Sequence, residues 1–186
     1  MSRPKLGREE KLKEKCQSLL DIVRQVAPLY LRSVTTELQR HYIETVIGAA
    51  IWYLPEDEFC WTGNISLEAI RSYHPDNPIK PKALSKDHDY PRKLAAVELL
   101  TKDWAKIANP LDELIRLYRE KFGRFNYITQ TENRRLMQHQ RKGVFTDSAT
   151  AYKNASIELV PINLDTLKKI KRKDRSVVEH FIQQYI

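Results

Sequence analysis

The sequence predicts a mostly α-helical protein with a small central β element, an α+β fold with helical arms at both ends. Apolar side chains recur at three- and four-residue spacing through the first 54 residues, which is typical of amphipathic helices. The segment 125–129, Phe-Asn-Tyr-Ile-Thr, is alternating and aromatic, as expected of a strand. Only 5 glycines and 9 prolines occur among 186 residues, so long flexible linkers are not expected. This length suits one domain, or one domain with a helical arm.

The first region, 1–54, is predicted to be a helical hairpin. Its first helix carries an apolar stripe from Leu12 to Val26 and is expected to end before Pro28. The second helix is expected from Leu31 to Leu54. The hairpin packs either on the rest of the chain or on a second copy, and we expect a homodimer through these N-terminal helices.

The middle region, 55–160, is predicted to mix short helices with extended segments. We expect irregular structure over 55–82 with a short helix capped by Ser66, an extended segment over 83–90, helices over 92–104 and 110–122, and a strand over 125–129. Thr131 is expected to cap a helix over 132–142, followed by a helix near 147–155 and an extended segment at 157–160. The last region, 161–186, is predicted to be a basic helical segment.

The net charge of +8 is concentrated in three windows. Residues 80–93, 119–143 and 162–186 carry net charges of +3, +5 and +3, and the rest of the chain is acidic. Such clustering is typical of proteins that bind a phosphate backbone, although solvated lysine-rich helix faces also produce it. We expect DNA as the partner, with RNA as the alternative, and no membrane partner.

Several protein classes are excluded by what the sequence lacks. Cys16 and Cys60 form neither a disulfide framework nor a C-x-x-C pattern. The longest apolar run, 46–54, is far shorter than the ~20 residues of a membrane helix. The charged N-terminus has no apolar signal-peptide segment, so we expect a cytoplasmic protein. There is no P-loop, G-x-G-x-x-G or G-x-S-x-G motif.

Two segments carry the residues that could perform chemistry. The first, 86–93, places His88 between Asp87 and Asp89 immediately before a basic helix start. In an extended strand the two carboxylates point to one face and the imidazole to the other. A bend at Pro91 would let one carboxylate and the imidazole serve a common site. The second segment, 125–136, leads from the predicted strand into a helix.

This arrangement resembles the HNH, or ββα-metal, endonucleases. The resemblance covers about 83–142 and rests on Asp87-His88, on Pro91 after this pair, on the strand at 125–129, and on Asn133 in the following helix. It implies a ββα-metal core and hydrolysis of DNA phosphodiester bonds. About 45 residues separate His88 from Asn133. The two intervening helices must therefore fold outward and return the chain beside its first strand.

The resemblance also implies roles for individual residues. His88 would be the general base on water, and Asp87 would bind a divalent ion, Mg²⁺ or Mn²⁺. Asn133 would either complete the metal shell or hold the loop that bears His88. His139 is a further candidate metal ligand, but Gln140 would project nearer to the helix face of Asn133. The side chains expected to contact nucleic-acid phosphates are Lys86, Arg92, Lys93, Arg134, Arg135, Arg141, Lys142, Lys168, Lys169, Lys171 and Arg172.

Three functional hypotheses remain open from the sequence. The first is a metal-dependent DNA endonuclease. The second is a non-catalytic nucleic-acid-binding protein that uses the same basic windows. The third is a helical interaction protein whose charge keeps it soluble. Under the second and third hypotheses, Asp87 and Asp89 are solvent-exposed charges of a loop ahead of a helix, and Asn133 is an ordinary residue of the first helical turn.

Overall fold

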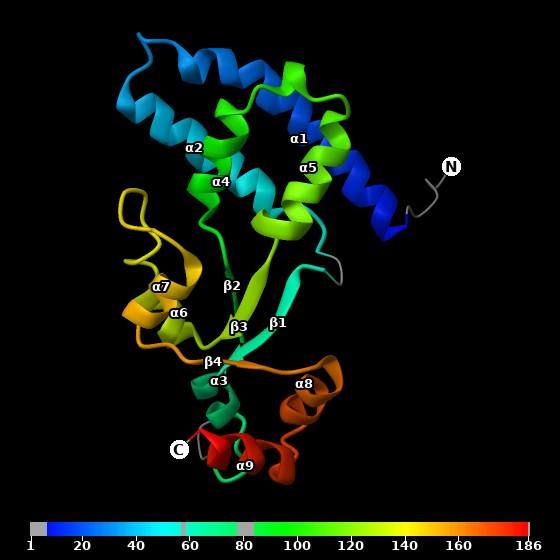
Figure 1. Cartoon of the computed structure of the whole chain (residues 1–186), viewed down its shortest axis with the longest axis vertical. Helices are drawn as coiled ribbons and strands as arrows, with labels where there is room; N and C mark the ends of the chain where they lie inside the picture. Colours follow the sequence, from blue (N-terminus) through cyan, green and yellow to red (C-terminus); the bar gives the residue numbers. More distant parts are fainter. Residues whose placement is uncertain (1–6, 57–58, 78–83, 186) are drawn as a thin grey trace, which may run out of the picture. The chain divides into compact units, whose positions relative to one another are not determined.

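The computed structural model describes residues 7–56, 59–77 and 84–185. The chain divides into two compact units, each built from two separate stretches of sequence (Figure 1). Unit 1 comprises 1–60 and 90–124, and unit 2 comprises 61–89 and 125–186.

These units differ from the three consecutive regions that we predicted from the sequence. Residues 90–124, which we assigned to the central region, pack with the N-terminal helices in unit 1. The C-terminal segment from 161 onward does not stand apart, since it packs within unit 2.

Unit 1 is helical throughout its described part. The helices are α1 (Arg8–Leu31), α2 (Glu37–Trp52), α4 (Arg92–Thr101) and α5 (Pro110–Leu117), with a 3₁₀ turn at Trp104–Lys106 and a π-helical turn at Tyr118–Phe122. Helix α4 packs against α1 and α2, and α5 packs against α1. A close approach sets the α2–α4 contact, because a Cβ on Gly48 would lie 3.1 Å from the Arg92 carbonyl oxygen. The buried core includes Leu12, Leu20, Ile47, Ile51, Leu99, Leu100 and Leu114.

The N-terminal hairpin is present, but its turn differs from the prediction. Helix α1 continues through Pro28 to Leu31, so the prediction that Pro28 ends it was wrong. Proline removes only one backbone donor, and the last turn is anchored by the buried Tyr30, whose hydroxyl donates to Glu44 at 2.8 Å. The second helix begins at Glu37 instead of Leu31, because Thr36 forms a capping box there.

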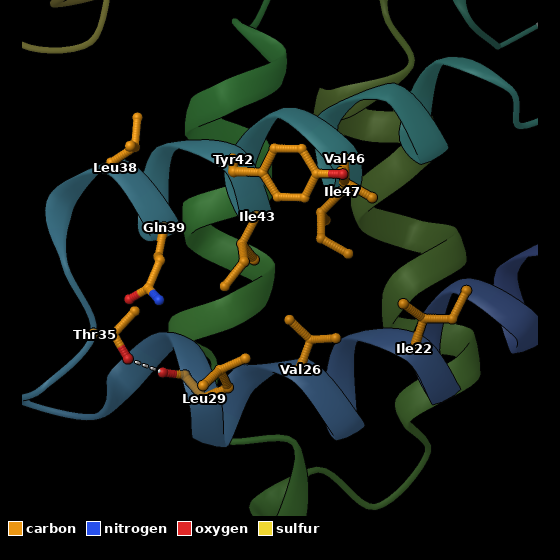
Figure 2. Close-up of a pocket in the computed structure, with 10 residues that line it drawn as sticks. All are labelled: Ile22, Val26, Leu29, Thr35, Leu38, Gln39, Tyr42, Ile43, Val46 and Ile47. Atoms are coloured by element: carbon orange, nitrogen blue, oxygen red, sulfur yellow. Dashed lines mark hydrogen bonds between the residues drawn. The ribbon is translucent and has the colours of Figure 1, made fainter.

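An apolar groove runs between α1 and α2 in unit 1 (Figure 2). Its α1 side includes Ile22, Val26 and Leu29, and its α2 side includes Leu38 and Tyr42 together with Ile43, Val46 and Ile47. Leu38 and Tyr42 are 79% and 70% exposed, so large apolar side chains border the groove at helical spacing.

Unit 2 contains a four-stranded mixed sheet. Its strand order is β2 (Ser85–His88), β3 (Phe125–Ile128), β1 (Trp61–Ser66) and β4 (Leu159–Pro161). Strand β3 is antiparallel to β2 and parallel to β1, and β4 is antiparallel to β1. The helices of this unit are α3 (Leu67–Ser72), α6 (Gln130–Leu136), α7 (Ser148–Asn154), α8 (Leu164–Lys171) and α9 (Arg175–Gln184).

Two apolar clusters hold the helices of unit 2 on its sheet. One unites β1 and β4 with α3, α8 and α9 through Ile65, Ile70, Val160, Ile170 and Val178. The other joins the end of β3 to α6 and α7 and is formed by Ile128, Leu136, Ala151, Tyr152, Ala155 and Ile157. In Figure 1, α6 and α7 lie on one side of the strands and α8 on the other. The two clusters lie on opposite faces of the sheet, because Ile65 of the first pairs with Tyr127 and Ile128 of the second is the next residue of β3.

The predicted mostly helical fold with a small β element is confirmed, as are the strands at 85–88 and 125–128. Ser66 caps α3 as expected, since its hydroxyl accepts from the Ala69 amide at 3.1 Å. Thr131 is not the cap of α6: Thr129 accepts from the Glu132 amide, so the helix begins earlier and ends at Leu136 instead of 142. Strand β1 was not predicted, because Gly63, at φ +87°, interrupts its pattern.

None of the helices in the described part of the chain combines the length and the apolar character that crossing a bilayer requires.

Candidate functional site

Strand pairing in unit 2 assembles the candidate site. The chain leaves β2 after His88 and returns as β3, which pairs beside it with Asp87 opposite Asn126 and His88 opposite Phe125. The chain therefore returns beside its first strand after the intervening helices, as expected from the sequence. Helix α6 begins two residues after β3 ends, so two antiparallel strands run directly into a helix.

Four polar side chains gather on the side of the sheet that faces α6 and α7: Asp87, Asp89, Asn126 and Tyr152, here called the carboxylate cluster. The Tyr152 hydroxyl donates to Asp87 Oδ2 at 2.5 Å. The Asn126 amide donates to the Tyr152 oxygen at 3.0 Å and to Asp89 Oδ1 at 3.1 Å. Asp87, Asn126 and Tyr152 are buried, so these bonds form away from bulk water.

Further donors fix the carboxylate cluster from the surrounding elements. Gln140 Nε2, beyond the end of α6, donates to Asp87 Oδ2 at 3.0 Å and to the His88 carbonyl at 3.3 Å. Ser148, the first residue of α7, donates to Asp89. Thr62 of β1 donates to the Asn126 side-chain oxygen. Gln140 and Ser148 thus bond the two carboxylates directly, and Thr62 holds the Asn126 side chain that bonds Asp89.

Burial changes the acidity of Asp87. Removal from water raises the pKa of this carboxyl to about 6, and the nearby charge of Asp89 adds to that rise. The hydrogen bonds from Tyr152 and Gln140 oppose it. The pKa of Tyr152 is raised as well, by its own burial and by the Asp87 charge, so it stays a proton donor. Asp87 is therefore a carboxylate whose ionised form is costly near neutral pH.

The carboxylate cluster contains oxygen ligands of the kind that a hard divalent cation prefers. Mg²⁺ is commonly held by one or two carboxylates while it keeps several waters and binds substrate phosphate oxygens. Asp87 and Asp89 would supply those two carboxylates, and a cation would also relieve the repulsion between them. Within the described residues, no group of three or more His, Cys, Asp or Glu side chains is placed so that it could hold a metal ion.

His88 and Asp87 lie on opposite faces of β2, because successive side chains of a strand alternate. Lys86 shares the face of His88, and its ammonium lies 5.0 Å from the centre of the Phe125 ring. His88 is the last residue of β2, and the chain bends immediately after it at 89–90. The imidazole is half-buried at this strand end.

The other two predicted site residues, Asn133 and His139, form hydrogen bonds with residues other than Asp87. Asn133 lies on α6, and its amide donates to Ser85 Oγ at 3.1 Å, on the same face of β2 as Asp87 but two residues away. His139 follows the end of α6, and its ring contacts Gln138. The side chain that reaches Asp87 from this segment is Gln140 and not His139. Asn133 therefore holds the helix to the strand.

The predicted phosphate-contacting residues are distributed over both units. In unit 1, the Arg92 guanidinium lies 4.3 Å from the Trp52 ring centre, and Lys93 Nζ lies 2.8 Å from His41 Nε2. In unit 2, the exposed ones occupy α6, the turn after it and α8: Arg134, Arg135, Arg141, Lys142, Lys168, Lys169, Lys171 and Arg172.

Asn126 and Tyr152 are the members of the carboxylate cluster that we did not single out from the sequence. The signal for Asn126 was present, because a polar residue inside the aromatic strand 125–129 lies opposite Asp87 once the strands pair in register. Tyr152 has no such signal, since it follows Asp87 by 65 positions and lies on a different element.

Comparison of the chain with family models, with curated proteins and with solved structures finds no match.

Proposed function

We propose that the chain is a divalent-metal-dependent endonuclease that hydrolyses DNA phosphodiester bonds. The observation that carries the proposal is the succession of β2, β3 and α6, with Asp87 directed to the α6 side of an antiparallel strand pair. The buried carboxylate, the adjacent Asp89 and the basic side chains of unit 2 are the groups that such chemistry needs.

Each residue has a distinct part in this proposal. Asp87 and Asp89 would hold the cation, which when bound supplies a Lewis acid for the scissile phosphate. His88 accepts the proton of the attacking water at the end of β2, where the chain bends at 89–90; within the strand its side chain lies on the face opposite Asp87. Asn133 is a positioning residue, because its bond to Ser85 fixes α6 against the strand that carries both groups.

A second candidate function is nucleic-acid binding without cleavage. The observation that favours it is the orientation of the Asp-His pair: Asp87 is 5% exposed and its neighbour His88 points to the other face. In this alternative the carboxylate cluster is a structural network, and the basic side chains alone contact the phosphates.

The experiment is cleavage of supercoiled plasmid by the full chain with Mg²⁺, with Mn²⁺ and with excess EDTA. We expect nicked or linear product with either metal and none with EDTA. A chain that shifts the plasmid in a gel but leaves it intact with both metals contradicts the endonuclease and supports the binding alternative. A chain that neither binds nor cuts at low salt contradicts both.

We also propose that the α1–α2 groove is a homodimer interface between two copies of unit 1. The apolar side chains of Leu38, Tyr42 and Val46 recur every four residues on α2 beside a groove of matching apolar character. A two-fold axis pairs such a ridge with the groove of the partner, since the same patch serves both copies.

For the groove, we expect light scattering to give about twice the chain mass of 21.9 kDa for the wild type. Tyr42→Glu places a charge in the apolar patch and should yield the monomer mass. Tyr53→Glu is the matched control, because Tyr53 is equally exposed at 72% but does not line the groove. A monomeric wild type at high protein concentration contradicts the dimer.

A further inference from the structure

The face of the unit 2 sheet opposite the carboxylate cluster carries aromatic rings and lysines together. It consists of Trp61, Lys86, Phe125, Tyr127 and Lys171, here called the aromatic–basic face. The Tyr127 ring centre lies 6.0 Å from that of Trp61 and 5.4 Å from that of Phe125, the second pair edge to face. The rings come from the two neighbouring strands β1 and β3. Phe125 is buried, at 4% exposed, and Trp61 and Tyr127 are half-buried where they pack beside the apolar cluster of β1, α3, α8 and α9. Trp61 and Tyr127 are therefore the two rings that remain partly accessible.

Two ammonium groups are held against these rings from different elements. Lys171 Nζ, from the end of α8, lies 4.5 Å from the Tyr127 ring centre, and Lys86 Nζ, from β2, lies 5.0 Å from that of Phe125. Such cation–π contacts favour a lysine over a ring without neutralising its charge. Three more cations, Lys168, Lys169 and Arg172, are exposed on and just after α8.

The electrostatics of this surface favour an anion. The pKa of Lys171 is lowered by partial burial and further by the charge of Lys86, so the two cations repel each other. No ion pair to Lys171 is present among the described residues. A phosphate group beside the Lys171 ammonium would offset this repulsion and accept a charge-assisted hydrogen bond from it.

We propose that the aromatic–basic face binds single-stranded nucleic acid, with an unpaired base stacked on Tyr127 or Trp61 and phosphates contacted by Lys86 and Lys171. Tyr127 and Trp61 are half-buried, so part of each ring is accessible to a ligand, and only unpaired bases offer a free face to such rings. In a duplex the base faces are stacked internally and would leave the rings unused. The inference goes beyond the proposed endonuclease, because the aromatic–basic face lies on the opposite face of the sheet from the carboxylate cluster and would be a second contact to nucleic acid.

The inference is tested by fluorescence anisotropy with a labelled single-stranded oligothymidine, a single-stranded oligouridine and a duplex of the same length, in EDTA so that nothing is cleaved. We expect either single strand to bind more tightly than the duplex. Tyr127→Ala should weaken single-strand binding about 5- to 100-fold while Tyr127→Phe, which keeps the ring, binds as the wild type does. Lys171→Gln should lower the slope of log affinity against log salt by about 0.7.

The matched charge control is Lys153→Gln, which removes one exposed cation from α7 in the same unit and should leave Tyr127-dependent binding unchanged. Duplex bound as tightly as single strand, or Tyr127→Ala binding as tightly as the wild type, would overturn the inference. A thermal melt of Tyr127→Ala verifies that the variant is folded. Tight, Tyr127-dependent binding without plasmid cleavage leaves this inference standing and overturns only the endonuclease. Plasmid cleavage by the wild type, together with single-strand binding that Tyr127→Ala does not weaken, overturns this inference and leaves the endonuclease standing.

Discussion

Asp87→Asn is expected to abolish cleavage and at the same time to stabilise the protein. Without its carboxylate the site loses a metal ligand, and cleavage should fall at least about 100-fold. The stability gain follows from the burial of Asp87, which raises the pKa of its carboxyl to about 6. At pH 7 the wild type therefore keeps an ionised carboxylate in a buried environment that disfavours its charge. Removing that charge should raise the free energy of unfolding by about 1 to 3 kcal/mol.

The pH dependence of the stability gain has a definite sign. Because the folded-state pKa of Asp87 is above the unfolded value of 3.8, the folded protein holds the proton more tightly. The wild type therefore loses stability as the pH rises from about 4 to about 6 and stays lower above that range. The difference between Asp87→Asn and the wild type should be largest at pH 7 and should narrow as the pH falls toward 4.

Urea unfolding at pH 7, 6 and 5 measures this difference, and plasmid cleavage measures the loss of activity. Asp165→Asn is the matched control, because Asp165 is exposed on α8 and should change neither quantity. Mg²⁺ should raise the melting temperature of the wild type but not that of Asp87→Asn, since a bound ligand stabilises only the form that binds it. Equal Mg²⁺ shifts in both proteins would exclude Asp87 as a ligand.

His88→Ala is expected to reduce cleavage by about 100- to 10,000-fold while leaving DNA affinity nearly unchanged. A general base acts on the chemical step, so its loss lowers kcat without removing the contacts that hold the substrate. His88 is half-buried at the end of β2, so truncation should leave the fold intact.

The measurement is single-turnover cleavage of a labelled duplex, together with its binding in EDTA. His180→Ala is the control, since His180 is an exposed histidine on α9 whose ring contacts Phe181 and lies away from the strands. Full activity of His88→Ala would exclude this imidazole as the base. An equal loss of binding and cleavage would assign His88 to phosphate contact.

Local sequence patterns predicted the elements that depend on near neighbours. The amphipathic spacing of α1 and α2 and the alternation at 125–128 are local, and both are confirmed. The ends of helices were less accurate, because Thr129 and Thr131 are both good caps and only the Glu132 carboxylate, which accepts from the Thr129 amide at 2.8 Å, decides between them. Strand β1 depends on pairing with β3 and β4, which its own residues do not reveal.

The candidate site could be predicted only in part for the same reason. Asp87 and His88 are adjacent in sequence, so a local motif identified them. The partners of Asp87 come from 53 and 65 positions further along, on Gln140 and Tyr152, and no spacing rule connects them. Strand alternation did predict that Asp87 and His88 face opposite ways, and the strand geometry of β2 agrees.

The passage of the chain from β2 into unit 1 and back to β3 has a consequence for folding. Closing a flexible loop of the 36 residues between His88 and Phe125 costs about 3 kcal/mol of chain entropy. While α4 and α5 are folded, that entropy is already lost, and the strand pair closes without it. If unit 1 unfolds, the sheet of unit 2 must bear the whole closure cost. The stabilities of the two units are therefore coupled through the covalent chain.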